Sequence, residues 1–151
     1  MRCAAMCPYG AGNFTEPNGT ITIPADYAAS VTCEYRITTG APIYLRFDAF
    51  ATEASYDTVT VYNGTSAFKP TRLGVFSGSI IPGIQYAASG SIFLRFQSDS
   101  SDAAGGVTIA WSTYMATFAP TTLAPTTTRN PAALARTRPL VANSGAKRVL
   151  L

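Results

Sequence analysis

The chain has 151 residues, of which 13% are charged, and a net charge of +3. This length predicts a single domain with a substantial core. Residues 1–118 contain six basic and all eight acidic residues, so this part offers no basic surface for nucleic acid, and no window is apolar enough for a membrane helix. Histidine is absent, which removes the usual general base and the Ser-His-Asp arrangement, so we do not expect an enzyme.

Seven short segments have the composition or the alternating pattern of β-strands, and glycine, proline or asparagine separates most of them. Residues 8–18, which precede these segments, are predicted to be a loop. No segment has helical periodicity, so the sequence predicts an all-β fold, an antiparallel β-sandwich. The predicted strands are residues 19–23, 32–38, 43–50, 58–62, 72–76, 91–97 and 107–114. We expect the two inner faces to be filled by Ile37, Leu45, Phe47, Val59, Val61, Leu94, Phe96, Ile109 and Trp111.

Two acidic corners follow predicted strands. Glu53 and Asp57 lie on a short connection, and because it is short we expect both carboxylates to face water. Asp99 and Asp102 lie in the second corner, separated by two serines. If the fold brings the two corners together, four carboxylates converge on one edge of the sandwich.

Cysteines and glycosylation sequences favour an oxidising, secreted route. A bridge between Cys7 and Cys33 would stabilise the fold by about 3 kcal/mol through loop-closure entropy, and would leave Cys3 over. Three Asn-x-Thr triplets predict N-glycosylation, and they begin at Asn13, Asn18 and Asn63.

The composition changes after Phe118. Residues 119–128 are a threonine- and proline-rich tract of the kind that carries O-linked sugars in stalks, and residues 129–151 lack periodicity and aromatic side chains. We therefore expect residues 1–118 to form the domain and residues 119–151 to be a disordered linker or stalk. The amino end lacks the pattern of a signal peptide, so the chain is expected to be a piece of a longer protein whose attached domains are missing.

Residues 7–114 resemble a CUB domain, an extracellular β-sandwich module with a jelly-roll arrangement. Cys7 and Cys33 have the spacing of the family's first disulfide, and Tyr27 stands six residues before Cys33. The other stretches that carry the resemblance are residues 19–22, 47–53, 56–57, 59–64, 73–78, 96–101 and 106–111. The family's second disulfide is lacking, because Ala54 (or Ser55) and Ser77 occupy its positions.

The resemblance implies a possible calcium site, because many CUB domains bind calcium at one edge. The positions that would supply oxygen ligands are occupied here by Glu53, Asp57, Asp99, Ser100 and Asp102. Tyr27 would support the glutamate without itself binding the ion. In such members a lysine or arginine of an extracellular protein partner reaches the acidic edge. The expected role is therefore protein recognition in a secreted protein or in the ectodomain of a membrane protein.

Two other functions remain open. The module could be a passive, glycosylated spacer between other domains, with its acidic edge unused. It could also bind carbohydrate through exposed aromatic side chains such as Tyr44 and Tyr62.

Overall fold

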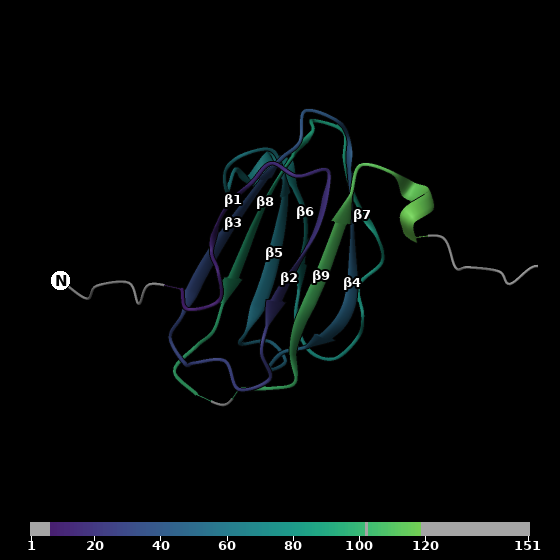
Figure 1. Cartoon of the computed structure of the whole chain (residues 1–151). Coiled ribbons are helices and arrows are strands. Elements are labelled where there is room, and N and C mark those ends of the chain that lie inside the picture. Colours follow the sequence, from purple (N-terminus) through teal and green to yellow (C-terminus); the bar gives the residue numbers. More distant parts are fainter. Residues whose placement is uncertain (1–6, 102, 119–151) are drawn as a thin grey trace, which may run out of the picture. The chain divides into compact units, whose positions relative to one another are not determined.

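Two sheets face each other in the computed structural model, which describes residues 7–101 and 103–118 (Figure 1). The described residues belong to one compact unit. They form nine strands and two short 3-10 helices, η1 (Lys69–Thr71) and η2 (Met115–Phe118). The strands are β1 (Gly12–Phe14), β2 (Asn18–Ile23), β3 (Thr32–Thr38), β4 (Ile43–Ala51), β5 (Thr58–Asn63), β6 (Arg72–Phe76), β7 (Gln85–Ala87), β8 (Ser91–Gln97) and β9 (Gly106–Ser112).

The five-stranded sheet has the order β1-β3-β8-β5-β6, and the four-stranded sheet has the order β2-β9-β4-β7. All neighbours are antiparallel except β1 and β3. The ring of Phe14 in β1 lies 5.2 Å from that of Trp111 in β9, and Phe47 in β4 lies 5.3 Å from Phe76 in β6. The β1 and β2 edges therefore share one side of the molecule, and the β6 and β7 edges share the other. The predicted all-β sandwich is confirmed.

The core lies between the sheets, as alternation in the strands predicts. All nine side chains expected to fill it are at most 3% exposed. Tyr27, Cys33 and Tyr35 are among the other buried side chains of this core.

Two local predictions were wrong. Residues 12–14 form β1 instead of a loop, because Phe14 packs against Trp111 and the segment pairs in parallel with β3. The last strand ends at Ser112 and not at Tyr114, because the Ser112 hydroxyl accepts the Tyr114 N–H at 3.0 Å and the chain then turns into η2. In both cases a tertiary contact decides a boundary that the local pattern leaves open.

Several expectations concern residues that lie outside the described part of the chain. These are the linker at residues 119–151, the pairing of Cys3, and the contribution of Asp102 to the acidic corner. None of the helical segments that the structure describes has the length and apolar character needed to span a membrane.

Gly19 has an essential packing role in β2, because the indole ring of Trp111 lies against its Cα. A Cβ at this position would come within 2.3 Å of two ring carbons of Trp111. We expect Gly19→Ala to lower the free energy of unfolding by about 1–3 kcal/mol, since the ring must shift out of a packed core. Gly12→Ala is the matched control, because a Cβ there meets nothing within 4 Å. Equal urea midpoints for the two variants would contradict this explanation.

Candidate metal centre

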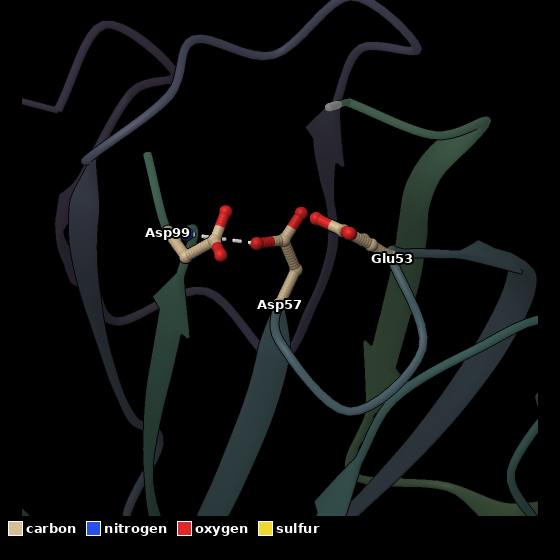
Figure 2. A group of neighbouring side chains, drawn as sticks. All are labelled: Glu53, Asp57 and Asp99. Carbon is tan, nitrogen blue, oxygen red and sulfur yellow. Dashed lines mark hydrogen bonds between the residues drawn. The ribbon is translucent and has the colours of Figure 1, made fainter. Parts of the chain in front are cut away.

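Three carboxylates from remote parts of the sequence meet at one end of the sandwich (Figure 2). Glu53 follows β4, Asp57 precedes β5 and Asp99 follows β8. One carboxylate oxygen from each lies within 4.8 Å of the others, and Asp57 lies between the other two. The antiparallel register sets this arrangement, because Thr58 of β5 lies opposite Gln97 of β8, so Asp57 and Asp99 leave the same end of the sheet.

Asp57 is fully buried, and the prediction that its carboxylate faces water was wrong. The corner folds back on itself, with the N–H groups of Tyr56 and Asp57 both donating to the carbonyl of Glu53. This turn directs the Asp57 side chain inward, where Oδ2 accepts the Tyr27 O–H at 2.5 Å and Oδ1 accepts the Asp99 N–H at 2.8 Å. Glu53 and Asp99 are half-buried.

Tyr27 is the buried support of this cluster. Its hydroxyl donates to Asp57 and accepts the main-chain N–H of Glu53 at 3.3 Å. Burial raises the pKa of Tyr27, and the hydrogen bond to the Asp57 carboxylate raises it further. The resemblance implied that Tyr27 supports the glutamate; its hydroxyl contacts the main-chain N–H of Glu53 and the side chain of Asp57.

The second corner is held by its own serine. Ser101 donates both its N–H, at 2.8 Å, and its hydroxyl, at 3.0 Å, to Asp99 Oδ1, and the same hydroxyl lies 3.4 Å from Glu53 Oε2. The Ser30 N–H donates to the Asp99 carbonyl. Ser100 is exposed between these residues. Sequence reasoning named Ser100 but not Ser101 as a site residue, although an aspartate often accepts the N–H two residues later in such a turn.

A polar network ties the first corner to the residues after β6, where the family's second disulfide is lacking. The Ser77 hydroxyl accepts the Ser55 N–H at 2.7 Å and donates to the Glu53 carbonyl at 3.1 Å. Thr52 donates its N–H to the Gly78 carbonyl at 2.9 Å, and its hydroxyl accepts the Gly78 N–H at 3.0 Å. These bonds hold the corner beside β6 without a covalent link.

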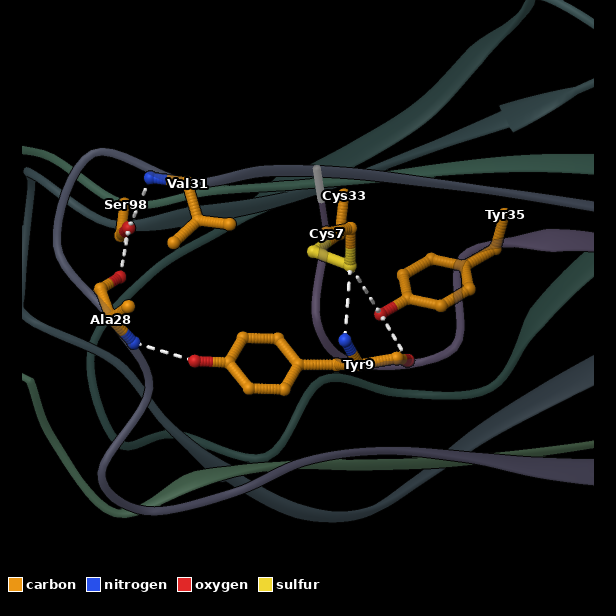
Figure 3. The surroundings of a disulfide bond; sticks show 7 residues. All are labelled: Cys7, Tyr9, Ala28, Val31, Cys33, Tyr35 and Ser98. Atoms are coloured by element: carbon orange, nitrogen blue, oxygen red, sulfur yellow. Dashed lines mark hydrogen bonds between the residues drawn. A yellow bond between two sulfur atoms is a disulfide. The ribbon is translucent and has the colours of Figure 1, made fainter. Parts of the chain in front are cut away.

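The first disulfide supports the same end of the molecule (Figure 3). Cys7 and Cys33 are bridged, with their Cα atoms 4.9 Å apart. The Tyr9 hydroxyl, close to this bridge in the chain, accepts the Ala28 N–H at 2.6 Å, and the Ser98 hydroxyl donates to the Ala28 carbonyl at 2.8 Å. The loop that carries Tyr27 is thus attached both to the disulfide segment and to the residue before Asp99.

The donor set suits a hard divalent cation, and calcium in particular. Calcium takes six to eight oxygen ligands, with carboxylates, carbonyls and water all acceptable. Each bonded oxygen of Asp57 keeps a second lone pair, so its two hydrogen bonds leave it able to bind an ion. A cation would also offset the repulsion between three carboxylates that lie this close together.

The tyrosines at this end make the fold sensitive to strong base. The pKa of Tyr27 is raised, and burial raises the pKa of Tyr35 to about 12, above the ordinary value near 10. The unfolded chain therefore releases the two tyrosine protons more readily than the folded chain does. The stability that the two protonated tyrosines contribute is complete below pH 10, and it is lost as the pH rises through their pKa values in the folded chain. We expect urea unfolding to show a falling free energy from about pH 10 upward. Tyr27→Phe should make this decline less steep. A free energy of unfolding that rises above pH 10 in the wild type would contradict the prediction.

The proposed aromatic sugar-binding surface is not formed as expected. Tyr62 is 7% exposed, because its ring packs 5.9 Å from that of Phe93 on the outer face of the sheet. Tyr44 is half-buried and stacks 5.0 Å from Tyr86. The two tyrosines named from the sequence therefore do not form a pair of exposed platforms.

Comparison with known sequences agrees with the resemblance to the CUB family. A family model described as the CUB domain matches residues 9–111. Human procollagen C-endopeptidase enhancer 1 is 32% identical over 114 residues, covering 68% of this chain and 25% of that protein. Human cubilin is 33% identical over 107 residues, covering 66% of this chain and 3% of that protein. The chain thus spans at most a quarter of the length of these relatives.

Solved structures agree with the sequence comparisons. A crystal structure of the MASP-1 CUB2 domain bound to Ca2+ has a TM-score of 0.59 and 28% identity, and the match covers 68% of this chain and 99% of that one. The full extracellular region of zebrafish Gpr126/Adgrg6 has a TM-score of 0.58 and 26% identity, covering 68% of this chain and 14% of that one.

Proposed function

The chain belongs to the CUB domain family, and we propose that it is an extracellular protein-recognition module whose acidic edge is stabilised by calcium. Glu53, Asp57 and Asp99 would hold the ion, and Ser100 and Asp102 would add oxygen ligands from the second corner. No catalytic role is proposed.

The observation that carries this proposal is the convergence of three carboxylate oxygens within 4.8 Å. Asp57 and Asp99 are 42 residues apart in the sequence, and a hydrogen bond from the Asp99 N–H to the Asp57 carboxylate already joins their two corners. An ion would link the corners further. The solved CUB domain with bound Ca2+ that this chain resembles supports the choice of cation.

The proposed ligand is a lysine or arginine side chain on a partner protein. Glu53 and Asp99 are half-buried beside the fully buried Asp57, so part of the cluster's charge reaches the surface. A partner cation there would form a charge-assisted contact with carboxylates that the ion also fixes in place.

A calcium titration tests the ion site directly. We expect isothermal titration with CaCl2 to give a Kd on the order of 10⁻⁴–10⁻³ M, the range of extracellular modules. MgCl2 is the control, because magnesium demands a smaller and more regular octahedral shell and should bind far more weakly. Absence of both binding heat and a shift in melting temperature with calcium would refute the site.

The spacer function keeps one observation in its favour. Asn13 and Asn18, which begin two of the Asn-x-Thr triplets, are exposed on the edge strands β1 and β2. Asn63 is half-buried and its Oδ1 accepts the Ser89 N–H at 3.3 Å. Sugars at the first two positions would cover one side of the sandwich. Mass spectrometry of the secreted protein, with and without removal of N-glycans, tests which triplets are used.

A further inference from the structure

Exposed apolar side chains gather in one stretch of the chain, on the side of the sandwich formed by the β6 and β7 edges. The described residues include ten large hydrophobic side chains that are exposed. Six of the ten lie within residues 68–84, namely Phe68, Leu73, Val75, Ile80, Ile81 and Ile84. Such a concentration on a soluble module marks an interaction surface more often than scattered apolar residues do.

The centre of this stretch is β6, an edge strand of the five-stranded sheet (Figure 1). β6 pairs only with β5, and within the described residues no other backbone hydrogen bond involves residues 73–76. Phe76 points inward against Phe47, so by alternation Val75 lies on the outer face, where it is 48% exposed. Leu73, at the register shift between β5 and β6, is 36% exposed. An edge of this kind presents unpaired N–H and C=O groups beside apolar side chains, which is a template for another strand.

Charge at this edge indicates the kind of strand that fits. Three of the described cations, Arg36, Arg46 and Arg95, form ion pairs with carboxylates. Lys69 and Arg72, at the start of β6, are exposed and form no ion pair with any residue that the structure describes. A partner strand with carboxylates would supply the missing counter-charges.

The same charges disfavour the other occupants. Residues 119–151 contain five basic and no acidic residues, so that segment would be repelled by Lys69 and Arg72. A second copy of β6 would bring two more cations and no carboxylate to this edge. We propose that the free edge of β6 accepts an extended, acidic segment of another protein, which adds to the sheet as a sixth strand between apolar side chains.

The probe is a capped, fluorescein-labelled peptide of alternating glutamate and valine, followed by fluorescence anisotropy with the full chain. Binding should weaken by about tenfold or more in Leu73→Asp and Val75→Asp, and also in Arg72→Glu. Tyr114→Asp is the matched control, because Tyr114 is 71% exposed but lies outside this stretch. Binding should persist in EDTA, which separates this surface from the proposed calcium edge. Failure of the peptide to bind, or equal loss in the control, overturns the proposal.

Two measurements test the strand geometry. Peptides N-methylated at every valine or at every glutamate block opposite edges of the added strand, so one form should lose binding and the other keep it. Equal behaviour of the two forms overturns strand addition. By NMR amide exchange, some amides of residues 73–76 should exchange rapidly in the free chain and become protected with peptide. If these amides are protected in the free chain at every concentration, a segment of the same chain covers the edge. If their protection grows with protein concentration, a second copy of the chain covers it. Either result overturns the proposal.

Discussion

Asp57→Asn is expected to abolish the stabilisation of this module by calcium. With a Kd of about 10⁻⁴–10⁻³ M, 10 mM calcium should stabilise the native chain by about 1.4–2.7 kcal/mol. Asp57 is the central carboxylate of the cluster, and an asparagine there removes its charge while keeping its size. The amide also places a donor near Tyr27 O–H or Asp99 N–H, both of which now donate to the carboxylate. We therefore expect melting curves of the variant to be the same in 10 mM calcium and in EDTA.

Asp48→Asn is the control for this experiment. Asp48 is an exposed carboxylate on β4 that pairs with Arg46 at 2.5 Å, and its loss changes the net charge of the chain by the same amount. This variant should keep the full calcium-induced shift. A shift of wild-type size in Asp57→Asn would show that calcium binds elsewhere, and loss of the shift in both variants would indicate a nonspecific charge effect.

Removal of the disulfide should have the largest effect on the stability of the fold itself. The double substitution Cys7→Ala with Cys33→Ala opens a loop that spans 26 residues of sequence separation. We expect a loss of about 3 kcal/mol in the free energy of unfolding, because the unfolded chain regains conformational freedom. The loss is large for a single domain, whose total stability is about 5–15 kcal/mol. Urea unfolding of the oxidised proteins measures it.

Cys3→Ser is the matched control, since it removes the third cysteine and leaves the Cys7–Cys33 bridge intact. Its urea midpoint should equal that of the wild type. A double variant as stable as the wild type would mean that the hydrogen bonds around Tyr9 and Tyr35 already fix this end of the chain without the bridge.

The sequence predicted the strands well because their signal is local. In β3, β6 and β8 the predicted and observed limits coincide, and alternation places Ile37, Leu94 and Phe96 correctly in the core. β1 could not be predicted in this way. It has only three residues, and it forms because its partner β3 lies more than 20 residues away and Phe14 finds Trp111.

The site shows the same division between local and remote information. The sequence shows acidic residues after strands, but their meeting depends on pairing between β5 and β8, which no periodicity encodes. The resemblance to a family supplied that information. The burial of Asp57 remained hidden, because it arises from a turn closed on the Glu53 carbonyl and from a tyrosine 30 residues earlier.

The remote origin of the cluster also bears on folding kinetics. The contacts that join Tyr27, Asp57 and Asp99 span 30 and 42 residues of sequence, so they close only after β5 and β8 are paired. Groups that assemble after the rate-limiting step affect the unfolding rate far more than the folding rate. An ion held there would therefore act as a latch: it would lengthen the lifetime of the native domain while leaving the speed at which a newly made chain folds almost unchanged.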